Sequence, residues 1–201
     1  MQARATTTLL AYGRTNTFLV RGRGSYLLVD TDYAGTLPAF FRGIKRLGVR
    51  VDDISCVLAT HYHPDHCGLV GELQGLGVTL LLLESQVGAP SYAAHVFERD
   101  GLAFAPLDQD GATVVSFDES RRCLARLGIG GEVLATPSHS PDSVSVALDD
   151  GCCLVGDLVP EGHLFAYGKD APERRDWDRV SAAGAVTVCH GHGPAFRGRL
   201  R

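Results

Sequence analysis

The stretch that decides the fold is Thr60-His61-Tyr62-His63-Pro64-Asp65-His66. It follows residues 54–59, an apolar run that predicts a buried strand, and it precedes a helical pattern that ends near Gly75. Side chains at the carboxyl end of a strand project from the sheet edge into accessible space. A lone His or Asp in such a loop is usually a turn or cap residue. Three imidazoles and one carboxylate together are much harder to explain by packing, so we interpret this stretch as a metal site.

The spacing within this stretch favours two cations. On an extended segment, His61 and His63 point the same way and can bind one ion, whereas Asp65 and His66, at the helix entry, can bind another. Pro64 fixes its own φ near about −65°, which stiffens the loop and reduces the entropy lost on binding.

Further ligands are expected at other strand ends, because so small a patch cannot surround two ions. Three residues have this position. His139 follows a strand predicted over residues 132–136, Asp157 follows the run 152–156, and His192 lies in a Gly-His-Gly turn after a strand predicted over 185–189. Each residue alone could be structural, since His in a Gly-rich turn and Asp after a strand are common. Their shared position is what indicates a common site.

The remaining pattern predicts two groups of strands interleaved with helices. The expected strands are 7–11, 17–20, 26–30, 78–83, 113–117, 143–148 and 152–155, and the expected helices are 37–47, 92–98, a short one before Gly128, and 172–183. Residues 84–127 give the weakest pattern, because Pro90 and two Asp-Gly pairs interrupt it. The arrangement predicts α/β layers with sheets inside and helices outside, in one domain spanning residues 1–201.

Composition excludes several classes of protein. With 45% hydrophobic and 21% charged residues, the 201-residue chain can bury a sizeable core. Lys and Arg number 19 against 23 Asp and Glu, a net charge of −4, which disfavours nucleic acid and anionic lipid as partners. We find no secretory signal and no apolar run long enough to cross a bilayer. The six cysteines include no CxxC pair, and reduced thiols fit the cytoplasmic location that we expect.

Five ordered segments resemble the motifs of the metallo-β-lactamase-fold hydrolases, over nearly the whole chain. They are Leu28-Val29-Asp30-Thr31-Asp32, the stretch 60–66, Thr136-Pro137-Ser138-His139-Ser140, Gly156-Asp157 and Gly191-His192-Gly193-Pro194. The second motif is highly specific in that family, whereas the fourth and fifth are informative only because they occur in the expected order along the chain.

This resemblance implies a four-layer αβ/βα sandwich with a dinuclear metal site at the edge between its halves. One metal would take His61, His63 and His139; the other would take Asp65, His66 and His192; Asp157 would bridge the two. Asp65 would also be catalytic, and Asp30 would support the ligands without binding metal. Cys189-His190-Gly191-His192-Gly193 offers two imidazoles. We choose His192 because the family shows Gly-His-Gly-Pro, and we expect His190 to donate a hydrogen bond nearby.

The resemblance also implies hydrolysis of a carboxylic ester, thioester or lactone by a metal-bridging hydroxide. The expected ions are two Zn²⁺, with Fe or Mn as alternatives. The ligand set resembles that of glyoxalase II without its C-terminal helical domain, as in shorter glyoxalase-II-like proteins. The alternatives are a mononuclear-iron oxidoreductase like the persulfide dioxygenases, using His61, His139 and Asp157, and a phosphodiesterase. β-Lactam cleavage is disfavoured because those enzymes typically lack the bridging Asp.

Substrate contacts are less well marked. Residues 161–169 contain polar and aromatic groups that could border the metal cleft, and His163, Tyr167 and Lys169 are the candidates; an ordinary surface loop is an equal alternative. Cys67, directly after His66, is interpreted as a packing residue. A small molecule is the expected partner, and the sequence leaves the oligomeric state open.

Overall fold

The strands of the computed structural model, which describes residues 6–194 and 196–197, form two sheets. Their bounds are β1 Thr6–Leu10, β2 Thr17–Arg21, β3 Tyr26–Val29, β4 Ile54–Leu58, β5 Thr79–Leu83, β6 Thr113–Val115, β7 Gly131–Ala135, β8 Val144–Leu148, β9 Cys152–Gly156, β10 Thr187–His190 and β11 Phe196–Arg197. The helices are α1 Leu37–Arg46, α2 Pro64–Cys67, α3 Val70–Gly75, α4 Ala89–Arg99, α5 Phe117–Arg126 and α6 Pro172–Ala182.

The first sheet has the order β1-β2-β3-β4-β5-β6 and the second has the order β11-β10-β9-β8-β7. The first three strands form the predicted antiparallel meander, and β3, β4, β5 and β6 then pair in parallel. In the second sheet β7, β8 and β9 are antiparallel and β9 pairs with β10 in parallel. Parallel neighbours place their carboxyl ends at one edge of a sheet, which is where the site lies.

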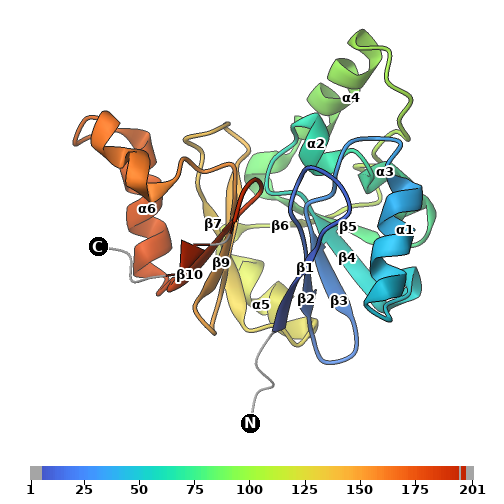
Figure 1. The fold of residues 1–201 in the computed structure, drawn as a ribbon, viewed down its shortest axis with the longest axis horizontal. Coiled ribbons are helices and arrows are strands. Elements are labelled where there is room, and N and C mark those ends of the chain that lie inside the picture. Colours follow the sequence, from blue (N-terminus) through green and yellow to red (C-terminus); the bar gives the residue numbers. More distant parts are fainter. Residues whose placement is uncertain (1–5, 195, 198–201) are drawn as a thin grey trace.

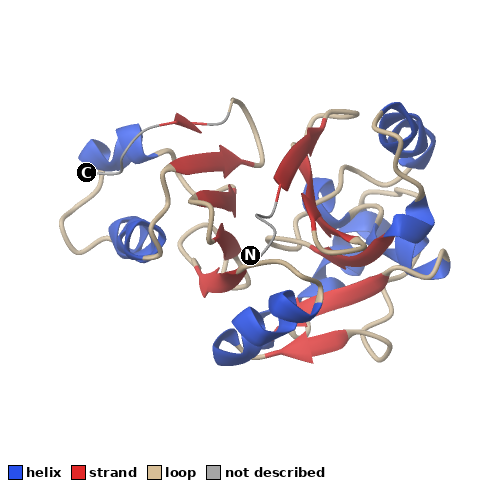
Figure 2. Ribbon diagram, turned by 90° about the horizontal axis from the view of Figure 1, so that it is seen from below, coloured by secondary structure: helices blue, strands red, loops and turns tan. Residues whose placement is uncertain are grey.

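Side-chain alternation along the strands builds the layers. In β5, Leu80 and Leu82 face the cluster that contains Phe40 of α1, whereas Leu81 and Leu83 face the cluster between the sheets. A strand covered on both faces in this way reads as a continuous apolar run. On the far side, Trp177 of α6 packs on the outer face of the second sheet. Figure 1 and Figure 2 show the resulting order of helices, sheet, sheet and helix, which confirms the four-layer αβ/βα prediction.

The local helix signals act as the sequence predicts in α1. Pro38 occupies its first turn, where a missing N–H costs nothing, and Phe40 and Ile44 are buried on one face. Gly48, just past the end, has a φ of 70°, which glycine adopts without strain.

The structure differs from the prediction where the pattern was weak. Helix α4 begins at Ala89, earlier than expected, because Pro90 lies in its first turn and starts the helix instead of breaking it. Helix α5 has 10 residues and fills the space between β6 and β7, so it is not the short helix expected. Residues 161–166, which the sequence predicts to be part of a loop, form a 3₁₀ helix. Strand β11 is a further element that the sequence pattern did not predict. Within residues 6–194 and 196–197, the helices are too short or too polar to span a bilayer.

Candidate metal centre

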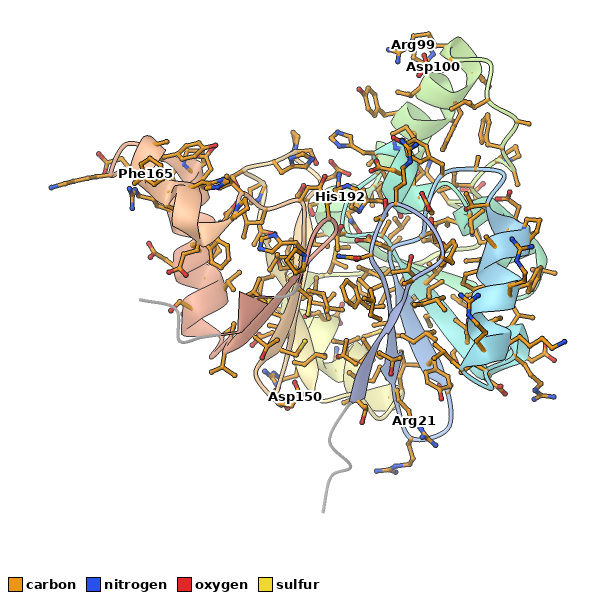
Figure 3. The ribbon with its side chains drawn as sticks, viewed as in Figure 1. Arg21, Arg99, Asp100, Asp150, Phe165 and His192 are labelled. Atoms are coloured by element: carbon orange, nitrogen blue, oxygen red, sulfur yellow. The ribbon has the colours of Figure 1, made fainter. Side chains whose placement is uncertain are left out.

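The predicted ligands converge from loops at the ends of strands in both sheets. His61, His63, Asp65 and His66 follow β4 and enter α2; His139 lies in the turn between β7 and β8; Asp157 follows β9; and His192 follows β10. Figure 3 shows His192 above the sheets, in the region where the loop after β10 approaches the loop between β1 and β2. All seven residues fall into groups whose candidate ligand atoms lie within 4.8 Å of one another.

One group consists of three imidazoles, His61, His63 and His139. Nε2 of His61 lies 3.0 Å from Nδ1 of His63, and Nε2 of His139 lies 3.1 Å from the same Nδ1 atom. Neutral imidazole nitrogens are good ligands for Zn²⁺ and for other transition metals. Three of them at this spacing form one face of a coordination sphere.

The second group is Asp65, His66 and His192. Nε2 of His192 lies 3.1 Å from Oδ2 of Asp65, and Nε2 of His66 lies 3.7 Å from that same oxygen. His66 is fully buried, whereas 46% of the His192 side chain is exposed. The group is therefore anchored on one side and open to solvent on the other.

Asp157 lies between the two groups and presents one carboxylate oxygen to each. Its Oδ1 atom is 3.3 Å from Nε2 of His66 and 3.6 Å from Nε2 of His192, and its Oδ2 atom is 3.9 Å from Nε2 of His139. This is the arrangement that a ligand shared by two ions requires.

Two buried atoms show that the cluster fits metal ions. Nε2 of His66 and Oδ1 of Asp157 have almost no exposed surface and no hydrogen bond in the structure, although they face each other. Buried polar groups without a partner are rare, because leaving one unsatisfied costs about 1–3 kcal/mol. A cation between these two ligand types would satisfy both atoms at once. The residues present therefore suit the divalent ions that the ligand pattern predicts.

The electrostatics of the metal-free cluster are those of a cation site. Burial opposes the charged form of His66, but the carboxylates of Asp30 and Asp157 outweigh burial and raise its pKa to about 10. Burial favours the neutral acid at Asp157, but the imidazoles around it, His66 foremost, hold the pKa of that carboxyl well below its usual range. Burial, followed by the neighbouring imidazoles, lowers the pKa of His61, so this residue stays neutral and able to bind a metal.

Asp30 contacts His66, and its expected role in supporting the metal ligands stays a prediction. Its carboxylate accepts hydrogen bonds from the Thr60 backbone N–H at 2.6 Å, from the Thr60 hydroxyl at 3.0 Å, and from Nδ1 of His66 at 3.0 Å. With Nδ1 engaged, Nε2 of His66 is left to face the other ligands. Asp30 has a φ of 61°, uncommon for a residue other than glycine, and these three bonds hold it there.

Several supporting residues were not found from the sequence. The Asp142 carboxylate accepts a hydrogen bond from the Tyr62 N–H at 2.7 Å, and the Asp176 carboxylate accepts one from the Ser138 N–H at 2.7 Å, next to His139. The buried Gln86 amide donates to the carbonyls of Ala59 and Asp142. These contacts join segments far apart in the chain, and no local pattern marks them.

Other candidates lie outside the cluster. The His190 ring packs 6.2 Å from the Trp177 ring, measured between centroids, and burial lowers its pKa. It belongs to none of the ligand groups found among the described residues. Cys67, the last residue of α2, is buried in the core, in agreement with a packing role. Tyr62 is buried in that same core.

The three predicted substrate contacts lie on a segment that is tied to α6. The carbonyls of Leu164 and Tyr167 accept hydrogen bonds from the Arg174 guanidinium, and Phe165 in this segment points outward (Figure 3). His163 and Lys169 are exposed. These hydrogen bonds join the segment to α6 and not to the candidate metal ligands. Substrate contact by His163, Tyr167 and Lys169 therefore stays a prediction.

Two sheets flanked by helices, with a His and Asp cluster at their shared edge, define a metal-dependent, hydrolase-like fold. The chain belongs to the metallo-beta-lactamase superfamily, whose family model matches residues 11–192.

Similar proteins support this assignment. Metallo-beta-lactamase domain-containing protein 1 of Xenopus laevis is 29% identical over 182 residues, which cover 85% of this chain and 67% of that protein. The human protein of the same name is 28% identical, with 85% of this chain and 59% of that protein covered. TTHA1623, solved in a di-iron-bound form, has a TM-score of 0.68 at 24% identity and covers 96% of this chain and 94% of its own. The last likeness concerns the fold alone.

Proposed function

We propose that this protein is a dinuclear metal-dependent hydrolase that opens a carboxylic ester, thioester or lactone, with Zn²⁺ as its metal. The observation that carries the proposal is the clustering of seven candidate ligand side chains, two of which, His66 and Asp157, have a buried ligand atom without a hydrogen bond. When bound, two divalent ions would supply a shared water of lowered pKa, hence a hydroxide nucleophile at neutral pH, and a Lewis acid for the carbonyl oxygen.

The residues of the chain divide the remaining work. His61, His63 and His139 would hold one ion, Asp65, His66 and His192 the other, with Asp157 shared. The side chains of His139 and His192 are 29% and 46% exposed, so a substrate would reach the centre past these two imidazoles. The Asp65 carboxylate, 18% exposed, is accessible to water and can accept the proton released during hydrolysis.

We further propose a small-molecule substrate and a cytoplasmic location. The net charge of −4 gives no general attraction for a phosphate backbone. The six cysteines include no CxxC pair, and reduced thiols would fit the cytoplasm. Detection of the protein in the cytosolic fraction of its cells, with no portion exported, is the expected result.

An iron-dependent oxidation is the second candidate. Its three ligands would be His61, His139 and Asp157, and Oδ2 of Asp157 does face Nε2 of His139 at 3.9 Å. TTHA1623, similar in fold, was solved with two irons. Iron content together with oxygen uptake would support oxidation, whereas zinc content with ester turnover would support hydrolysis.

The test is a substrate panel run on protein of measured metal content. Thioesters, lactones, aryl esters and phosphodiesters are assayed with chelated protein and with protein reloaded with Zn²⁺ or Fe²⁺. We expect Zn²⁺-dependent turnover of a carbonyl substrate. Asp65→Asn and His139→Ala should abolish it with little change in the circular dichroism spectrum, and His139→Ala should also lower the metal content. The exposed Asp178→Asn is the control. Activity on phosphodiesters alone, or unchanged turnover in both variants, contradicts the proposal.

A further inference from the structure

The loop between β1 and β2, residues 11–16, contacts the turn that carries the last ligand, although the two segments lie at opposite ends of the described chain. Asn16 is the centre of this contact. Its backbone N–H donates to the Gly191 carbonyl at 2.7 Å, and its side-chain amide donates to the carbonyls of His190 at 2.9 Å and Gly193 at 2.7 Å. Because both side-chain partners are carbonyl oxygens, only the NH₂ group can face them, which fixes the orientation of the amide.

The neighbours of Asn16 reach the ligands directly. The Arg14 carbonyl lies 3.3 Å from Nδ1 of His192 and can accept a hydrogen bond from it, which leaves Nε2 of His192 facing Asp65. The Thr15 hydroxyl donates to Oδ2 of Asp65 at 3.5 Å. A hydrogen bond on the far nitrogen of a metal-binding imidazole sets the ring orientation and the tautomer. The loop therefore acts on the Asp65, His66 and His192 group and makes no such contact with His61 or His63 among the described residues.

The turn needs this support because it leaves the sheet next to an irregularity in strand pairing. The pairing of β10 with β9 shifts register between Cys189 and His190, just before the turn. Gly191 then donates to the Gly156 carbonyl at 2.7 Å and passes so close to the ligands that a Cβ there would lie 2.5 Å from Cε1 of His66. The half-exposed His192 side chain follows, held from the outside by the loop that contains Asn16.

We propose that Asn16 is the positioning residue for His192, and that the β1–β2 loop thereby sets the affinity of the Asp65, His66 and His192 group for its ion. This inference rests on the proposed dinuclear site. Without the two side-chain hydrogen bonds of Asn16, His192 would have to be ordered when the ion binds, and that ordering would oppose binding. The His61, His63 and His139 group, without contacts to Asn16, would keep its ion.

The experiment compares Asn16→Asp, Asn16→Ala and His192→Ala with the wild-type protein. Asn16→Asp keeps the side-chain shape but turns an oxygen toward two carbonyl oxygens. Gln74→Glu is the matched control, since the Gln74 amide also makes two hydrogen bonds, both with Asp108 and neither with a ligand. Chelated proteins are dialysed against buffered free Zn²⁺, and bound metal is measured by elemental analysis. Co²⁺-substituted samples are compared by visible absorption.

We expect two ions per chain in the wild type and in Gln74→Glu, and one in His192→Ala. Both Asn16 variants should bind the second ion about 10–100-fold more weakly, as is typical for loss of a residue that supports a ligand. Raising free Zn²⁺ by that factor should restore the second ion, which general misfolding would not allow. The Co²⁺ spectrum of Asn16→Asp should resemble that of His192→Ala at low metal and that of the wild type at high metal.

The failures are distinguishable. Two ions bound by the Asn16 variants with wild-type affinity, while His192→Ala binds one, overturn this inference and leave the proposed function standing. Fewer than two ions in the wild type overturn both. If Asn16→Asp does not fold, Asn16→Ala, which removes the donors without adding a charge, decides the matter by the same criterion.

Discussion

Asp30→Asn should destabilise the metal-free protein and weaken metal binding by removing the acceptor for His66. The carboxylate accepts three hydrogen bonds, and both Asp30 and His66 are at most 1% exposed. Asparagine can still accept from the Thr60 N–H, and the Thr60 hydroxyl can rotate to accept from the new NH₂ group. Nδ1 of His66, however, loses the carboxylate acceptor that it has in the wild type. Loss of one such charge-assisted bond costs about 1.5–3 kcal/mol.

Asparagine is the informative replacement because it tolerates the positive φ of residue 30 as well as aspartate does, so backbone strain is unchanged. For a chain of this size, each kcal/mol shifts the unfolding temperature by about 2–4 °C, so a fall of about 3–12 °C is expected. Thermal unfolding is followed by circular dichroism in chelator, with the exposed Asp178→Asn as control. Metal affinity is measured separately and should fall about 10–100-fold. An unfolding temperature and a metal affinity both equal to those of the control would refute the role assigned to Asp30.

Three further predictions follow from local geometry. Gly191→Ala should lower the metal content, because the new Cβ would lie 2.5 Å from Cε1 of His66. Gly75→Ala, which has open space around it, is the control and should keep the wild-type content. Equal metal content of the two variants by elemental analysis would contradict this prediction. Burial raises the pKa of the Cys56 thiol to about 11, so about 0.1% of the thiol is thiolate at pH 8. The rate of Cys56 alkylation should therefore rise roughly tenfold per pH unit until the pH approaches 11. Peptide mass spectrometry measures this rate, and a pH-independent rate would count against the prediction. Asp176→Ala should lower the free energy of unfolding by about 1–3 kcal/mol in urea titration, because the Ser138 N–H and the Arg179 guanidinium both lose their acceptor. A change below about 0.5 kcal/mol would show that these two bonds contribute little.

The fold was predictable where local pattern and tertiary environment agree. The meander, α1 and the apolar run of β5 can be recognised from the periodicity of their apolar residues, from the turn glycines and from the helix caps. Residues 84–127 were harder to interpret, because Pro90 starts a helix in its first turn as readily as it ends one elsewhere. Which of these meanings applies depends on the packing of α4, and packing is not a local property of the sequence.

The same distinction separates the ligands from the residues that support them. The candidate ligands stand out in the sequence because metals restrict the residue type and because His61, His63, Asp65 and His66 are close together in sequence. Asn16 and Asp142 act across separations of 174 and 80 residues. Their chemistry is an amide or a carboxylate meeting a backbone group, which many other polar residues of the chain could perform. Only the three-dimensional structure selects these two.

The division of the ligands between the sheets links metal binding to folding. Four ligands follow β4 of the first sheet, and His139, Asp157 and His192 follow strands of the second. The two sets meet only when the apolar cluster between the sheets is packed, so the seven candidate ligands come together only in the folded chain. Each ion that binds the folded chain at about 100 times its dissociation constant adds about 2.7 kcal/mol to stability. We therefore expect substitutions in the core between the sheets, far from any candidate ligand, to weaken metal binding by loosening this arrangement, which elemental analysis of such variants would check.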